Sequence, residues 1–162
     1  MVRRPGRREL TEDAPPTLRP LRPSRPTDAA AVASIWLASF AATYRFPPAH
    51  TADEVRDWVA EVLLPGTETW VAQESDEPVG FISLDDRSID QLYVLPEWTG
   101  RGIGSGLVRF AQDRRPDGLE LWTFQVNAGA RRFYERHGFH AVELTDGSGN
   151  EERQPDVRYV WP

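Results

Sequence analysis

The 162-residue chain contains no cysteine and no lysine, so arginine supplies all of its permanent side-chain positive charge. Without cysteine, disulfides, zinc–thiolate sites and a cysteine nucleophile are excluded. Without lysine, a phosphate-binding P-loop is excluded, because that motif requires a lysine after its glycines. No apolar run approaches the ~20 residues of a membrane-spanning helix, and no apolar segment follows the N-terminal arginines as a signal peptide would require. We therefore expect a cytoplasmic protein that does not enter membranes.

Charge and composition also bear on the ligands the protein can bind and on its number of domains. The net charge of −6 does not favour a nucleic-acid surface, and the three histidines lack the spacing of a metal site, so we predict no metal. A chain of this length that is 40% hydrophobic can bury one proper core. Residues 1–16 show no periodicity and are predicted to form a flexible tail. Residues 17–162 are predicted to form the single domain.

Helical spacing predicts two helices in the first half of the domain, over residues 28–44 and 52–64. Thr27 or Asp28 is expected to cap the first helix, and Thr51 with Glu54 matches a capping box for the second. The predicted buried faces comprise Val32, Ile35, Trp36 and Phe40 in the first helix and Val55, Trp58, Val59 and Val62 in the second.

The rest of the domain is predicted to form mainly β-strands. Pro20 is tolerated in the first strand only if that strand lies at a sheet edge, and residues 75–78 are expected to join two strands of a hairpin. The pattern predicts an α/β (α+β) fold: one mixed, mostly antiparallel sheet of about seven strands, flanked by about four helices. The expected strands are 17–22, 69–73, 79–84, 87–94, 119–124, 139–144 and 157–161. Of the two remaining helices, one is expected to follow Gly106 and end near Arg115, and the other to span 130–137.

The segment most informative about function is Leu92–Leu107, which contains a strand end, a glycine-rich loop and the start of a helix. A short strand ends before Pro96, four glycines follow at positions 100, 102, 104 and 106, and a helix begins after them. Glycine allows close approach of the backbone, and a helix N-terminus carries partial positive charge. This arrangement indicates a site for a phosphate or diphosphate.

A dinucleotide-binding fingerprint fits this stretch poorly. Its third glycine would fall at Ser105, Leu107 or Arg109, depending on the starting glycine. The next predicted strand also ends without the acidic residue that would bind a ribose.

The segment Leu-Tyr-Val-x-Pro-x-x-x-Gly-Arg-Gly-Ile-Gly-Ser, starting at Leu92, resembles the acetyl-CoA-binding motif of the GNAT superfamily of N-acetyltransferases. A second block, Asn127–Phe139, resembles the following motif of that family, and the likeness covers roughly residues 17–162. It implies an N-acetyltransferase that moves an acetyl group from acetyl-CoA to a primary amine of a small molecule or peptide by direct attack. The coenzyme-binding residues that it implies are Leu92, Tyr93, Val94, Thr99, Gly100, Arg101, Gly102, Ile103, Gly104, Ser105 and Asn127.

The resemblance also assigns roles. The backbone N–H of Val94 would stabilise the oxyanion, and Asn127 would contact the pantetheine arm, a role compatible with capping a helix. Thr99 departs from the glutamine or arginine that is usual in the family, so diphosphate binding would depend more on backbone amides. Arg101 would add charge there or remain a solvated loop cation.

Tyr134 lies seven residues after Asn127, about two helical turns, and so on the same helix face. The corresponding tyrosine of the family protonates the departing thiolate, and a phenol is neutral at pH 7 and able to donate. The alternative is that Tyr134 is an aromatic of the core.

The general base and the acceptor site are less sharply marked. Asp90 shares a predicted strand face with Leu92 and Val94, so it is a candidate base or a solvated sheet residue. A water chain with no dedicated base is a further alternative. Glu151 and its neighbour Glu152 are candidates for binding a cationic amine. The alternative is that both are simply charged residues of a solvated loop. Tyr44 and Phe46, beside a proline break, are predicted near the substrate.

Two further possibilities stay open. A non-catalytic acyl-CoA-binding regulatory or sensor module would use the same loop, although it would have no use for a phenol at Tyr134. Open edge strands at both ends of the predicted sheet would permit a homodimer.

Overall fold

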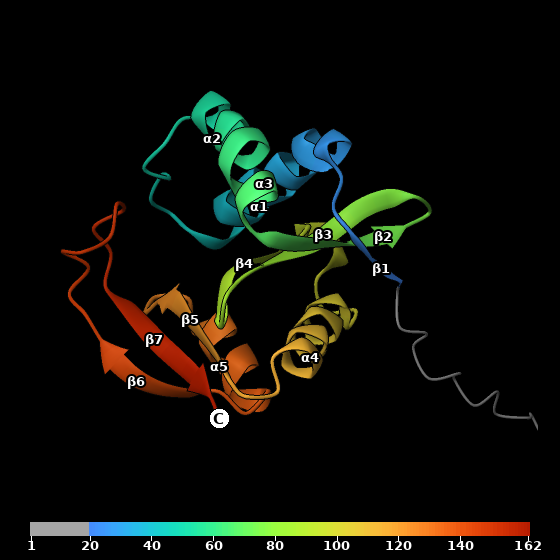
Figure 1. Ribbon diagram of the computed structural model, residues 1–162. Helices are drawn as coiled ribbons and strands as arrows, with labels where there is room; N and C mark the ends of the chain where they lie inside the picture. The colour runs from blue at the N-terminus through green and yellow to red at the C-terminus, as the bar shows by residue number, and fades with distance from the viewer. Residues whose placement is uncertain (1–19) are drawn as a thin grey trace, which may run out of the picture.

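The computed structural model describes residues 20–162 and contains a single mixed sheet with helices on both faces (Figure 1). The predicted tail 1–16 and the first residues of the strand predicted from Thr17 lie outside the described part. The strand order is β1-β2-β3-β4-β5-β7-β6, antiparallel except for the parallel pair β4 and β5. The strands are β1 (Leu21–Pro23), β2 (Glu68–Glu74), β3 (Glu77–Asp85), β4 (Ser88–Val94), β5 (Leu119–Phe124), β6 (His140–Leu144) and β7 (Asp156–Trp161).

Two helical layers cover opposite faces of the sheet (Figure 1). On one face, Ile35 and Val59 of the helices nearest the N-terminus share a core cluster with Phe81 of the sheet. On the other face, Leu107 of α4 shares a core cluster with Leu121 and Tyr159 of the sheet, and Tyr134 of α5 belongs to the same cluster. The helices are α1 (Ala29–Thr43), α2 (Ala52–Trp58), α3 (Leu64–Gly66), α4 (Ile103–Arg114) and α5 (Ala128–Arg136), with 3₁₀ turns η1 (Pro26–Asp28) and η3 (Pro96–Trp98) and a π-helical segment η2 (Val59–Leu63).

The start of α1 differs from the prediction. The turn η1 precedes the helix, and the Asp28 carboxylate makes no cap to it. Instead it accepts two hydrogen bonds of 2.8 Å from the Arg22 guanidinium and one of 2.7 Å from the Arg25 N–H. These contacts tie the edge strand β1 to the start of α1. The capping box at Thr51 and Glu54 is present as predicted.

The second helix contains a π-helical segment that the sequence did not reveal. One extra residue in a turn rotates the residues after it about the helix axis, so the predicted buried stripe is wrong at its end. Val62 is 57% exposed, whereas Leu63 is 1% exposed and continues the stripe of Val55 and Val59. The segment α2–η2–α3 still forms one continuous helical stretch that ends at Gly66.

The hairpin between β2 and β3 is also tighter than predicted. Ser75 and Asp76 alone form the turn, both with positive φ, as in a two-residue type I′ turn. Pro78 lies inside β3, opposite Gln73, where the register shifts between Ala72 and Gln73. That irregularity accommodates a residue with no N–H.

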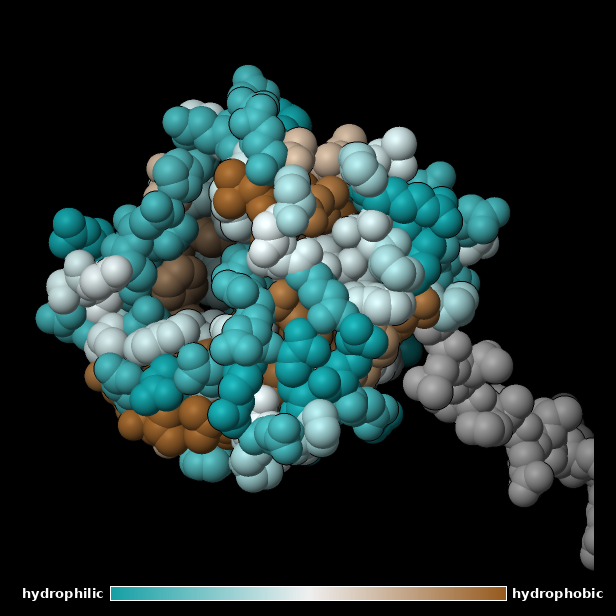
Figure 2. Space-filling model, viewed as in Figure 1, coloured by the Kyte–Doolittle hydropathy of each residue, from teal (hydrophilic) through white to brown (hydrophobic). Residues whose placement is uncertain are grey.

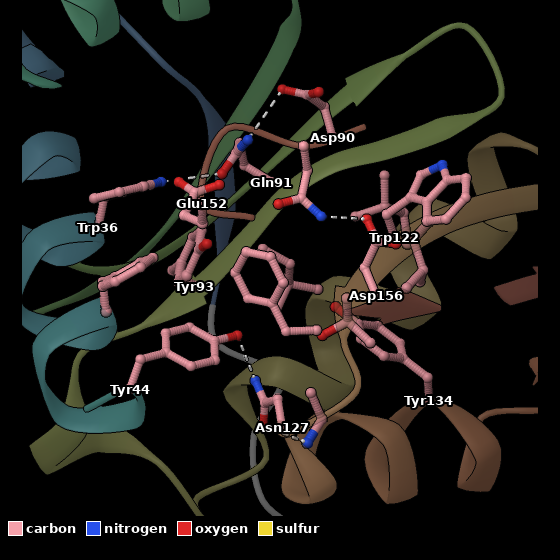
Figure 3. Close-up of a pocket in the computed structure, with 18 residues that line it drawn as sticks. Trp36, Tyr44, Asp90, Gln91, Tyr93, Trp122, Asn127, Tyr134, Glu152 and Asp156 are labelled. Atoms are coloured by element: carbon pink, nitrogen blue, oxygen red, sulfur yellow. Dashed lines mark hydrogen bonds between the residues drawn. The ribbon is translucent and has the colours of Figure 1, made fainter. Parts of the chain in front are cut away.

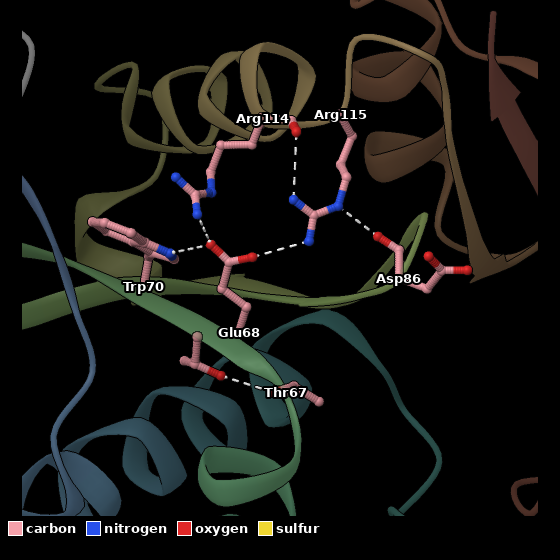
Figure 4. A network of polar contacts seen from close by, with 7 residues as sticks. Thr67, Glu68, Trp70, Asp86, Arg114 and Arg115 are labelled. Carbon is pink, nitrogen blue, oxygen red and sulfur yellow. Dashed lines mark hydrogen bonds and ion pairs between the residues drawn. The ribbon is translucent and has the colours of Figure 1, made fainter.

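A charged cluster fixes α4 against the sheet (Figure 4). The Glu68 carboxylate of β2 binds both Arg114 and Arg115 at the helix C-terminus, the latter at 2.9 Å, and accepts the Trp70 indole N–H at 3.0 Å. Burial raises the pKa of Glu68, but these donors outweigh it, so the pKa is lowered overall. The C-terminal end of the helix that follows the glycine loop is therefore fixed to the sheet.

Candidate active site

The site begins where β4 and β5 separate. The two parallel strands pair at one position, Ser88 opposite Glu120, and then diverge. A cavity of about 290 Å³ lies between them, lined by Leu92 and Tyr93 on one side and Phe124 on the other (Figure 3). The space-filling view shows the molecule hollowed there, with hydrophobic atoms in the floor (Figure 2).

The backbone of β4 offers a hydrogen-bond donor to this opening. The Leu95 N–H donates to the Val79 carbonyl at 2.8 Å, and successive amides of a strand point to opposite edges. The Val94 N–H therefore points towards the β5 side, where none of the described strands pairs with it. The Val94 carbonyl accepts a 2.8 Å hydrogen bond from the Ser39 hydroxyl of α1, which anchors this end of the strand.

The glycine loop presents free amides, as expected for an anion site. Gly100 and Gly102 have φ of +73° and +84°, a conformation that favours glycine. Within residues 20–162, no backbone N–H from Gly100 to Ser105 donates to a protein acceptor; the series resumes with the Gly106 N–H, 3.0 Å from the Gly102 carbonyl. These unpaired donors at the start of α4 fit a diphosphate.

The side chains of the loop are engaged locally. The Thr99 hydroxyl donates to the Pro96 carbonyl at 2.8 Å, and the Arg101 guanidinium lies 4.5 Å from the centre of the Trp98 ring. Ile103 is buried in the core, and Gly104 packs against the Phe133 ring, where a Cβ would lie 3.3 Å from it. Anion binding therefore depends chiefly on the loop amides.

Asn127 links the two sides of the cavity. Its side-chain oxygen caps α5 by accepting the Ala130 N–H at 3.0 Å, and its amide donates to the Tyr44 hydroxyl at 2.9 Å (Figure 3). Tyr44 lines the cavity. Phe46 does not: it stacks on Tyr44, with ring centres 4.9 Å apart, and packs against Phe124.

Tyr134 lines the cavity from α5 and is 8% exposed. Its ring packs against Phe133, Phe139 and Tyr159. No hydrogen bond engages its hydroxyl within residues 20–162. Burial raises its pKa well above the ordinary value of about 10, so the phenol keeps its proton at neutral pH. Such a group can donate a proton and cannot serve as a base.

The predicted strand face of Asp90 is wrong. The register shifts between Ser83 and Leu84, so that Ser83 faces Gln91 and Leu84 faces Ile89, which leaves Asp90 as the extra residue of a β-bulge. Ile89, not Asp90, joins Leu92 in the core beneath α4.

Asp90 nevertheless lines the cavity; the residue stays exposed, and partial desolvation raises the pKa of its carboxyl. The Gln91 side chain contacts this carboxylate at 3.4 Å and accepts the Trp36 indole N–H at 3.1 Å (Figure 3). The indole fixes which end of the Gln91 amide faces Asp90. Sequence reasoning missed Gln91, because only the bulge brings it beside the carboxylate.

The two adjacent glutamates before β7 have different positions. Glu151 bonds the imidazole of His50 at 2.8 Å on the exposed side, whereas Glu152 lines the cavity beside Tyr93 (Figure 3). Within residues 20–162, no hydrogen bond or ion pair engages the Glu152 carboxylate. Glu152 is therefore better placed than Glu151 to meet an amine. Among the described residues, no group of three potential metal-ligating side chains lies together.

Comparisons with known proteins agree with this geometry. The family model described as "Acetyltransferase (GNAT) domain" matches residues 65–141. The chain is 30% identical over 143 residues to the peptidyl-lysine N-acetyltransferase YiaC of Escherichia coli, an alignment that covers 88% of this chain and 96% of YiaC. The chain belongs to the GNAT family.

Other GNAT proteins support the assignment. The peptidyl-lysine N-acetyltransferase YjaB of Escherichia coli is 35% identical over 120 residues, covering 74% of this chain and 80% of YjaB. The solution structure of apo YjaB superimposes with a TM-score of 0.74 over 88% of this chain and 96% of that one. As a GNAT acetyltransferase, the protein is an acyltransferase that uses acetyl-CoA. No described helix is long and apolar enough to cross a membrane.

Proposed function

We propose that this GNAT enzyme acetylates a primary amine by direct attack on acetyl-CoA, and that the amine is a lysine side chain of a peptide or protein. The observation that carries the proposal is the gap between β4 and β5: the Tyr134 side chain lines its cavity, and the Val94 N–H points towards the same gap one residue beyond the lining residue Tyr93. The names of YiaC and YjaB favour a peptidyl lysine over a small-molecule amine. A cytoplasmic location and a homodimer remain predictions from the sequence.

Binding of the coenzyme would use backbone groups. The free amides from Gly100 to Ser105, together with the start of α4, would hold the diphosphate. The pantetheine arm would lie in the gap beside β4 and pass Asn127, whose amide nitrogen is available if it releases Tyr44.

In the transfer step, the neutral amine nitrogen bonds to the thioester carbon and the carbon–sulfur bond breaks. The Val94 N–H donates a hydrogen bond to the carbonyl oxygen as negative charge develops there. The Tyr134 hydroxyl gives its proton to the departing sulfur, and a carboxylate of the cavity, Asp90 or Glu152, receives a proton from the amine, directly or through water. Asp90 lies four residues before Val94, roughly 13 Å along the strand, so its route requires water.

A non-catalytic acyl-CoA-binding module is the alternative. It would need the glycine loop and the gap beside β4, but it would not need a buried phenol that has no hydrogen-bond partner among the described residues. Tyr134 therefore favours the enzyme.

The test is calorimetric titration of the protein with acetyl-CoA beside CoA, NAD and ATP, followed by thiol release with a lysine peptide. We expect saturable binding of acetyl-CoA, no response to NAD or ATP, and release of CoA that requires the peptide. Binding without amine-dependent release would favour the binding module, and no binding at millimolar acetyl-CoA would contradict both functions.

A further inference from the structure

A second cavity, of about 470 Å³, adjoins the first. Its wall is formed by α1, by α2 and the loop that precedes it, by Gln91 of β4 and by the loop before β7. The two cavities share Trp36, Gln91 and Glu152 as lining residues. A substrate whose amine reaches the first cavity past Glu152 therefore places its neighbouring groups in the second. We call the second the outer cavity.

The outer cavity has two indole walls. Trp36 and Trp58 both line it, and the hydrogen bond from the Trp36 indole N–H to Gln91 at 3.1 Å fixes the plane of that ring. Indole faces attract cations more strongly than the rings of phenylalanine or tyrosine. Trp58 is only partly buried, although the helical pattern of α2 places it near the core face.

The same cavity is negatively charged. Glu54, Glu151 and Glu152 line it, and among the described residues His50 is its only basic lining residue. His50 contacts two of the three carboxylates, at 2.8 Å for Glu151 and 3.6 Å for Glu54. The balance is therefore negative whether His50 is charged or neutral. Glu54 also accepts the Thr51 N–H at 2.7 Å, which holds its carboxylate in place.

We propose that the outer cavity binds a second cation of the acceptor, so that the preferred substrate carries a positive charge next to the amine that is acetylated. The inference rests on the proposed function, because it concerns the acceptor of that same reaction. In a peptide, the second cation is an arginine or lysine flanking the target lysine. In a small molecule, it is the far amine of a diamine or polyamine. The shared chemistry is an amine with a neighbouring cation.

The test compares acceptors that differ in one charge. Two seven-residue peptides with blocked termini carry a central lysine, flanked by arginine in one and by its neutral isostere citrulline in the other. We expect kcat/KM about tenfold higher for the arginine peptide, as one ion pair and one cation–π contact would give. Pentane-1,5-diamine against pentylamine tests the small-molecule source in the same way.

Variants connect the preference to the cavity. In the double variant Glu54→Gln with Glu151→Gln, the ratio of kcat/KM for the arginine peptide to kcat/KM for the citrulline peptide should fall to within about twofold. Glutamine preserves the capping geometry at position 54. The matched control is Glu61→Gln, on the same helical stretch but lining neither cavity, which should keep the full preference.

The possible outcomes distinguish failure of the second-cation site from failure of acetyl transfer itself. A preference in either acceptor pair that the double variant abolishes supports the outer cavity and identifies its source. Equal rates within both pairs, or a preference that survives the double variant, would overturn the second-cation site while leaving acetyl transfer intact. No acetylation of any of the four acceptors would overturn the proposed function, and the site with it.

Discussion

The substitution Tyr134→Phe isolates the proposed general acid, because it removes one oxygen and keeps the packed ring. The hydroxyl has no hydrogen-bond partner within residues 20–162, and the side chain is 8% exposed. Replacing an unpaired polar atom with an apolar edge costs little stability, so we expect the free energy of unfolding to change by less than about 0.5 kcal/mol. Loss of a positioned general acid lowers rates by about 10²–10⁴.

We therefore expect kcat for CoA release to fall at least about a hundredfold in Tyr134→Phe, with acetyl-CoA affinity within about twofold of the wild type. The assay is thiol release with a saturating lysine peptide, and thermal unfolding serves as the control for folding. A kcat within threefold of the wild type, in a folded variant that binds acetyl-CoA, would show that the phenol of Tyr134 is only part of the core.

Four further tests concern the glycine loop, the general base, the π-helical segment and the His50–Glu151 contact. Thr99→Arg should lower KM for acetyl-CoA about fivefold by adding a charged donor beside the diphosphate, and an unchanged or higher KM in steady-state kinetics would contradict this. Asp90→Asn should lower kcat about a hundredfold and remove the acid limb of the pH–rate profile, because desolvation raises the pKa of a base that acts only when it is ionised. If Glu152→Gln has these two effects and Asp90→Asn does not, Glu152 is the base. Leu63→Ala should cost about 2–5 kcal/mol in denaturant unfolding and Val62→Ala less than about 0.5 kcal/mol, whereas the reverse order would refute the π-helical register. His50→Gln should lower Tm more at pH 5.5 than at pH 9, because the hydrogen bond to Glu151 raises the pKa of His50. The stabilisation from this contact is complete below about pH 6.5 and is lost as the pH rises through the raised pKa. A difference in Tm that does not depend on pH would count against the His50–Glu151 contact.

Much of the fold follows from local signals. Period-two alternation located β2 through β7 to within a few residues, and the capping box at Thr51 marked the start of α2. The last helix, predicted from residue 130, begins two residues earlier, at Ala128, directly after its cap Asn127. The glycine loop was also readable, because positive φ at Gly100 and Gly102 demands glycine whatever the tertiary context. These features depend on residues close together in the chain.

The errors come from register, which depends on contacts far apart in the chain. Spacing alone places Val62 in a buried stripe, and only packing against the sheet selects the π-helical segment that buries Leu63 instead. Likewise, the bulge at Asp90 is set by pairing with β3, so simple alternation placed its side chain on the wrong face.

The loop before β7 shows the same limitation. Glu151 and Glu152 are equivalent in sequence terms, and either could have met the substrate. Their difference arises from the loop conformation, in which Arg153 has a positive φ and the Asn150 side chain binds the Gln154 backbone at 2.7 Å and 3.2 Å. No local pattern specifies that conformation.

The most direct test of acetyl transfer is mass spectrometry of a blocked lysine peptide incubated with acetyl-CoA and the enzyme, with released CoA measured in the same sample. We expect one acetyl group on the lysine Nε for each CoA released, at a rate that saturates with both substrates. Release of CoA without peptide acetylation, or bound acetyl-CoA with no release on any amine, would contradict it.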